Sequence, residues 1–431
     1  MSTIAFYENL VMSIYLELEW INYECESMVY CLSQENENPS ETKGTLKDAF
    51  RIKKERLIWI DQGRGFVMFI LVLTELMPGC LKSACYTSNV YVKALAGFFL
   101  DHPANSTSAP YMNIYDVGVP AFFFIIGLLM AVSFKKRIET HGRWNAVANS
   151  ALRWGLLYGL GLAIIFFTYK QGFGDVEQIA PGVYAYVVSW DVIPALGFVG
   201  LVSIPFMFLP NKARLIIAYA MMTFYQIMTF IPQMYWREYA AASVHGGIIG
   251  GIFVMTGFVL VGSCVGEYFL LNKEASQHKK YMMLALLSVI NLAIGLGLWA
   301  IPGGFPNKRQ STMGWATISI AIVIAGLFGF IFLNLKKQHK TVILEAYGMN
   351  PFLIYALAVV PGAIINALLP DSVTSDFLFQ ATYWIGAVAG ITALAIGLYM
   401  VGKAISTTKV IAVLLVILLP VGIIAKLFGV I

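Results

Sequence analysis

Apolar segments of about 20 residues recur along most of this chain, separated by shorter polar stretches. An α-helix needs about that length to cross the hydrocarbon layer of a bilayer. The apolar runs are continuous and do not alternate strictly, which favours helices over a membrane β-barrel. The pattern predicts an all-α, polytopic integral membrane protein with about 11 transmembrane helices. The predicted spans are 62–80, 116–134, 149–168, 188–209, 213–232, 245–270, 280–301, 314–334, 343–368, 377–401 and 409–429.

The first 50 residues differ from the rest of the chain. They hold nine acidic residues and only two basic ones, Lys43 and Lys47. Glutamates interrupt their apolar positions, and no basic segment precedes them, which argues against a secretory signal peptide. We therefore predict an acidic cytoplasmic N-terminal extension over 1–50, followed by a transmembrane domain over 51–431.

Lysine and arginine in the predicted loops give the orientation, because cytoplasmic loops carry an excess of these residues. One set of alternate connections holds 20 of them and the opposite set holds 6. This bias places the N-terminus in the cytoplasm and, with an odd number of spans, the C-terminus outside. The longest external loop is then 81–115, and the plasma (inner) membrane is the expected location.

Composition agrees with this class, since 58% of the residues are hydrophobic and 12% are charged. The net charge of +5 follows from the loop bias and does not indicate nucleic-acid binding. Cys80 and Cys85 fall on the predicted external side, so a disulfide between them is one option. Paired cysteines with metal-ligand spacing are missing from the sequence, and no metal site is predicted. The sequence also lacks a P-loop, a nucleophile elbow and a dinucleotide fingerprint.

Candidate chemistry on the cytoplasmic side begins with Asp61 and Arg64, which are three residues apart and can meet on one helical face. Arg64 is either an anchor for lipid headgroups or a fixed cation for a phosphate-bearing ligand. Further along, Pro351 removes a helix hydrogen bond inside a predicted span, and Asn350 precedes it. A broken helix of this kind often lines a cavity. Asn350 is explained equally well by a functional role at such a cavity and by simple helix packing.

On the external side, His102 follows an apolar part of the loop 81–115 and stands between Asp101 and Asp116. An imidazole titrates near neutral pH and can serve as a general base, and a neighbouring carboxylate can orient it. The plainer explanations are a solvated loop histidine and, for Asp116, an acid that favours the start of a helix.

In their order along the chain, these motifs resemble the membrane acetyltransferases related to heparan-α-glucosaminide N-acetyltransferase, including the bacterial members of that superfamily. The resemblance covers roughly 57–370 and is carried by three segments and His102. The segments are 60–65 (IDQGRG), 116–127 (DVGVPAFFFIIG) and 348–355 (GMNPFLIY).

The resemblance implies an acyltransferase that takes an acetyl group from cytoplasmic acetyl-CoA to an external acceptor, such as the amine or hydroxyl of a sugar. His102 would be the base or acyl carrier, and Asp116 would orient it. Arg64, held by Asp61, would bind CoA phosphates, and Asn350 would line the path of the pantetheine arm. The bilayer, acetyl-CoA and a carbohydrate are then the expected partners.

Two other functions remain open from the sequence. One is a secondary transporter of a small polar solute, which would use Glu75, Asp116, Asp191 and His245. The other is a non-catalytic relative of the acyltransferases. A homodimer is also left open.

Overall fold

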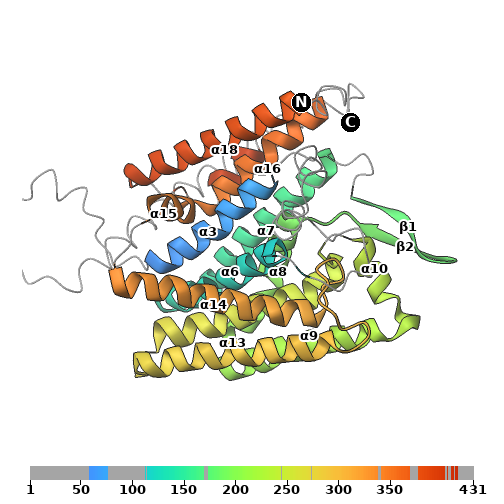
Figure 1. The fold of residues 1–431 in the computed structure, drawn as a ribbon, viewed down its shortest axis with the longest axis horizontal. Coiled ribbons are helices and arrows are strands. Elements are labelled where there is room, and N and C mark those ends of the chain that lie inside the picture. The colour runs from blue at the N-terminus through green and yellow to red at the C-terminus, as the bar shows by residue number, and fades with distance from the viewer. Residues whose placement is uncertain are drawn as a thin grey trace, which may run out of the picture.

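Most of the described chain is helical, and the long helices run side by side in an elongated bundle (Figure 1). The computed structural model describes residues 58–75, 112, 114–168, 173–243, 245–272, 274–337, 341–368, 377–402, 405, 409–411 and 413–415. His102, Cys80, Cys85 and the N-terminal extension lie outside these residues.

The elements follow one another along the chain in this order. The first part contains α3 (Ile58–Glu75), η3 (Ile114–Val117), α6 (Gly118–His141), α7 (Arg143–Thr168), β1 (Gly174–Ala180) and β2 (Val183–Val188). The middle contains α8 (Val192–Ser203), η4 (Pro205–Phe208), α9 (Asn211–Phe230), η5 (Pro232–Met234), α10 (Trp236–Ala242) and α11 (Gly247–Gly250). The last part contains η6 (Gly251–Met255), α12 (Thr256–Gly266), η7 (Glu267–Leu271), α13 (Gln277–Trp299), α14 (Met313–Lys337), α15 (Val342–Met349), α16 (Pro351–Leu368) and α18 (Phe377–Met400).

Seven helices of the described chain are long and apolar enough to cross a membrane, or up to eight if a bent pair is counted as one span. This confirms the prediction of a helical, polytopic membrane protein. Helical structure also occupies each of the first ten predicted spans, while the eleventh, 409–429, lies mostly outside the described residues. The total of eleven and the sides of the two termini stay predictions.

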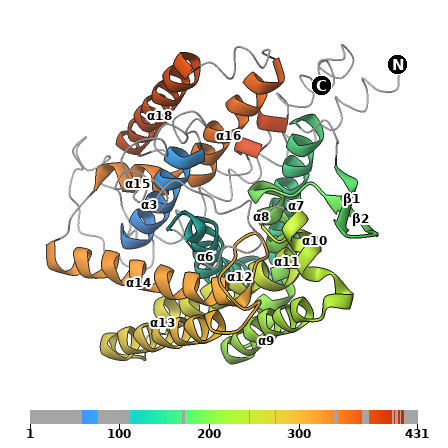
Figure 2. The ribbon, with the colours of Figure 1, turned by 45° about the vertical axis from the view of Figure 1, so that its right-hand side comes forward.

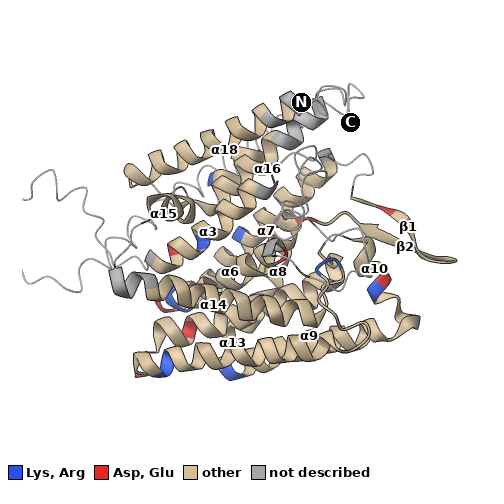
Figure 3. Cartoon of the chain, in the orientation of Figure 1, with Lys and Arg blue, Asp and Glu red and all other residues tan. Residues whose placement is uncertain are grey.

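The outer helices have the surface that a bilayer requires. Figure 3 shows long uncharged stretches on α13, α14 and α18. Large apolar side chains are exposed there, among them Val289, Ile290 and Ile385. By contrast, α6 and the helical run 247–271 are mostly buried and lie in the middle of the bundle (Figure 2). Exposed apolar side chains on the outer helices are expected where a protein contacts lipid. Burial of the central helices is expected where helices pack against one another.

A two-stranded hairpin interrupts the helical pattern. β1 and β2 pair antiparallel, with Gly174 opposite Val188, and Gly182 in the turn has a φ of 74°. The hairpin extends from one end of the bundle beside α10 (Figure 1). An all-α fold was predicted, so this strand pairing is a correction to the expected structure. The local signal was a Pro-Gly turn followed by β-prone valine and tyrosine residues.

Small residues bring the central helices into close backbone contact. A β-carbon at Gly127 of α6 would collide with the backbone of Val259 in α12, and one at Gly262 would collide with Phe124. Helices in a bilayer gain little from the hydrophobic effect between them, so such close packing supplies much of their association.

Helices α3 and α15 also come into close backbone contact through glycines. A β-carbon at Gly65 of α3 would collide with the carbonyl group of Leu344 in α15, and one at Gly348 would collide with that of Asp61. These two glycines therefore fix the distance between α3 and the break after α15, where part of the candidate site lies.

We expect Gly65→Ala to destabilise the protein by about 1–3 kcal/mol, the usual cost of forcing extra atoms into a packed contact. Thermal unfolding of the purified protein in detergent measures the effect. The matched control is Gly159→Ala in α7, where a β-carbon would meet no atom within 4 Å. The control should leave the melting temperature unchanged or slightly raised, because alanine favours helices over glycine. Equal melting temperatures for the two variants would contradict the close contact of Gly65 with α15.

Candidate functional site

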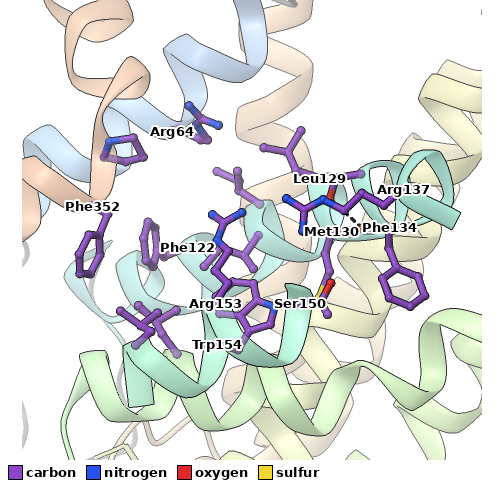
Figure 4. Close-up of a pocket in the computed structure, with 16 residues that line it drawn as sticks. Arg64, Phe122, Leu129, Met130, Phe134, Arg137, Ser150, Arg153, Trp154 and Phe352 are labelled. Atoms are coloured by element: carbon purple, nitrogen blue, oxygen red, sulfur yellow. Dashed lines mark hydrogen bonds between the residues drawn. The ribbon is translucent and has the colours of Figure 1, made fainter. Parts of the chain in front are cut away.

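A cavity of about 130 Å³ lies between α3, α6, α7 and the start of α16 (Figure 4). Its lining is mostly apolar and includes Phe122 of α6 and Phe352 of α16. Three arginines also line it: Arg64 from α3, Arg137 from α6 and Arg153 from α7. The cavity thus combines an apolar wall with three permanent positive charges.

Arg64 is held in place from both sides. Its guanidinium lies 3.2 Å from a carboxylate oxygen of Asp61, so the predicted pairing on one helical face is confirmed. The same guanidinium donates a hydrogen bond to the carbonyl oxygen of Gly348. That carbonyl belongs to the last turn of α15, where a helix has no further donors of its own. Arg64 is therefore oriented by the broken helix as well as by its ion pair.

The break itself is sharp. The axes of α15 and α16 differ by 81°, and Pro351 and Phe352 just after the break line the cavity. This confirms the prediction that Pro351 marks a broken helix beside a cavity. Asn350 is buried in the break, and its side-chain oxygen accepts a hydrogen bond from the backbone of Ile405, 2.7 Å away. Asn350 is not one of the lining residues, so its predicted contact with the pantetheine arm stays a prediction.

Arg153 comes from the helix that faces the break. Its guanidinium carbon lies 5.3 Å from the ring centre of Trp154, a cation–π arrangement. Its Nε is buried and has no hydrogen-bond partner among the described residues. Ser150, one turn earlier on α7, adds a buried hydroxyl to the lining. Arg153 thus has donor capacity that an anion in the cavity could satisfy.

Positive charge exceeds negative charge around the cavity, even with Arg64 paired to Asp61. No carboxylate is found among its lining residues within the described chain. Asp61 offsets the charge of Arg64, which leaves Arg137 and Arg153 to repel each other across a small space, and this repulsion is stronger where water is limited. A phosphate group would relieve this repulsion and accept hydrogen bonds in the planar geometry that guanidinium groups prefer.

A buried carboxylate lies close to this cavity. Glu345 of α15 accepts a hydrogen bond from Gln62 at 3.2 Å and one from the hydroxyl of Tyr399 at 2.5 Å. These contacts join α3, α15 and α18 beside the Asp61–Arg64 pair. A buried acid with good donors is stable in a bundle interior, and this cluster holds the broken helix in place.

The predicted external residues form a separate polar region. Asp116 is buried in η3, and its carboxylate lies 4.0 Å from the ammonium group of Lys308. The backbone oxygen of Asp116 accepts a hydrogen bond from the indole of Trp315. The backbone of Arg309, next to Lys308, accepts a hydrogen bond from Gly246, beside the buried His245. The loop around Lys308 therefore connects the regions of Asp116 and His245.

The predicted contact between Asp116 and His102 stays a prediction, since His102 lies outside the described residues.

Of the residues considered for a transporter, Asp191 caps α8, where its carboxylate accepts a hydrogen bond from Val192. That position gives Asp191 a structural role. Within the described chain, no group of three histidine, cysteine or acidic residues could hold a metal ion.

Sequence reasoning missed Arg153, Ser150 and Lys308. Arg153, inside the predicted span 149–168, and Lys308 were counted only as charges that indicate orientation. The available signal for Arg153 was its position inside a predicted span, where a charged side chain usually faces the interior of the protein. For Lys308, only the folded loop shows that its ammonium group faces Asp116.

Neither models of known protein families nor characterised proteins match this sequence.

Proposed function

We propose that this protein is a membrane acyltransferase that binds acetyl-CoA from the cytoplasm and acetylates an acceptor on the other side. The main support is the convergence of Arg64, Arg137 and Arg153 in one cavity. CoA carries a diphosphate and a further phosphate, and arginine is the side chain best suited to such groups. The cavity is large enough for a phosphate group, so the rest of the CoA molecule would extend beyond it.

The transfer step follows from the resemblance to the acetyltransferases. His102 would remove the proton from an amine or hydroxyl of the acceptor as that atom attacks the thioester carbonyl. The carbon–sulfur bond then breaks, the acetyl group stays on the acceptor, and the CoA sulfur leaves as a thiolate that takes up a proton. Asp116 would hold the imidazole in position, and Lys308 would hold the Asp116 carboxylate in place through their ion pair. A sugar is the proposed acceptor.

The first test is binding of acetyl-CoA to the purified protein in detergent, measured by calorimetry. We expect saturable binding that Arg153→Gln weakens by at least about tenfold, the loss expected for one charge-assisted hydrogen bond. Arg143→Gln is the matched control, because Arg143 starts the same helix but is exposed and lies outside the cavity lining. Failure of acetyl-CoA to bind the folded wild type at millimolar concentration would contradict the proposal.

A secondary transporter is the second candidate. The observation that favours it is the 81° break between α15 and α16 beside a cationic cavity. Transporters commonly bind their substrates where spans are interrupted. Under this alternative the cavity would bind a small anion, and proteoliposomes would take up radiolabelled phosphate in a manner that depends on Arg153. Phosphate uptake without acetyl-CoA binding would favour the transporter.

A further inference from the structure

A groove of about 660 Å³ runs between α9, α13 and the helical run α12–η7. Leu215 lines it from α9, Leu286 and Ile290 from α13, and Val265 and Leu271 from the third wall. It shares no lining residue with the arginine cavity. Leu286 and Ile290 are also among the exposed apolar side chains, so the groove opens on the surface expected to face lipid.

The groove has a closed end and an open end. One turn beyond Leu215, the hydroxyl of Tyr219 donates a hydrogen bond to the side-chain oxygen of Asn291 at 3.0 Å. This bond joins α9 to α13 and closes the groove toward the middle of the helices. The open end lies at the starts of α9 and α13, which the distribution of basic residues assigns to the cytoplasm.

The lining at the open end holds two basic and two acidic residues, and further basic residues next to it give this end a positive excess. Glu267 is already neutralised, because it forms ion pairs with the fully buried Arg214 and with Lys135. Glu274 is the other acid in the lining. The basic residues at or next to this end are Lys135, Arg214, Lys212, Lys279 and Lys280. Lys212 lines the groove and is exposed, so its ammonium group is accessible to a ligand.

We propose that this groove binds one anionic phospholipid of the cytoplasmic leaflet. The phosphate would lie against Lys212, and an acyl chain would fill the space between Leu215 and Ile290. Three features favour a specifically bound lipid over lipids that exchange freely with the bilayer. They are the three helical walls, the closed inner end and the positive entrance. Basic pockets between transmembrane helices on the cytoplasmic side bind anionic headgroups for the same electrostatic reason. The proposal does not depend on acetyl-CoA binding.

The test is native mass spectrometry of the full-length protein in detergent, titrated with palmitoyl-oleoyl phosphatidylglycerol or with the matching phosphatidylcholine. We expect one phosphatidylglycerol to bind more tightly than phosphatidylcholine. Lys212→Gln should weaken phosphatidylglycerol binding by about fivefold, the effect of one basic residue near a headgroup. Ile290→Trp should remove this bound lipid because the larger side chain fills the groove.

Val289→Trp is the matched control, since Val289 is next in sequence, 63% exposed and not part of the lining. It should bind phosphatidylglycerol as the wild type does. Equal binding by the two tryptophan variants would overturn the groove as the site. Equal binding of the two lipids by the wild type would overturn its anionic selectivity. Lys212→Gln is a surface change that keeps the fold, so it tests the proposal even if Ile290→Trp fails to fold.

Discussion

His102→Ala is expected to lower acetyl transfer by about 10²- to 10⁴-fold, the usual contribution of a general base. The acceptor would then have to lose its proton to water, which is a weaker base at neutral pH. Binding of acetyl-CoA should be unchanged, because the arginines of the cavity belong to other segments. The measurement is transfer of label from radiolabelled acetyl-CoA to an amino sugar, chosen by a screen of glucosamine and its oligomers.

Two further variants serve as controls for the His102→Ala measurement. His278→Ala changes an exposed histidine at the start of α13 and should keep full activity. Asp116→Asn removes the carboxylate that faces Lys308 and should lower the rate while acetyl-CoA still binds. Full transfer by His102→Ala would refute the proposed base. A wild type that binds acetyl-CoA but transfers to no acceptor would favour a non-catalytic relative.

Glu267→Leu should destabilise the protein by about 3 kcal/mol, because it leaves a buried charge without its counterion. Arg214 is fully buried, and its guanidinium forms an ion pair with Glu267. Its other described contacts are the hydroxyl of Ser263 and the sulfur of Met207, and neither carries a charge. Thermal or denaturant unfolding in detergent measures the loss.

The double variant Arg214→Leu/Glu267→Leu should recover most of this stability. Removing both charges together avoids the cost of burying one alone, and apolar replacements of buried ion pairs are often tolerated. Glu274→Gln is the control, since Glu274 is exposed on the same side and should change stability by no more than about 0.5 kcal/mol. A double variant less stable than Glu267→Leu would contradict this explanation, because it would show that Arg214 stabilises the fold even without its counterion.

The membrane class and the position of most helices could be predicted from the chain alone. A bilayer has one thickness, so every span needs an apolar segment of about the same length. Such segments can be found from the order of residues alone. The break at Pro351 could be predicted for an equally local reason, since proline lacks the amide hydrogen that a continuous helix needs. Asp61 and Arg64 were paired correctly because they are one helical turn apart. The hairpin at 174–188 was missed, because the stretch between the predicted spans 149–168 and 188–209 was taken as a loop and strand pairing depends on contacts between two segments.

Contacts between distant segments were decided by the tertiary structure. Arg64 and Arg153 are 89 positions apart, and nothing local indicates that they line one cavity. The same holds for Lys308 beside Asp116 and for Arg214 beside Glu267. The sequence by itself determined where helices form and which parts are apolar, because these depend on neighbours along the chain. Only the packed bundle decided which charges face one another, because that depends on how glycines let particular helices approach.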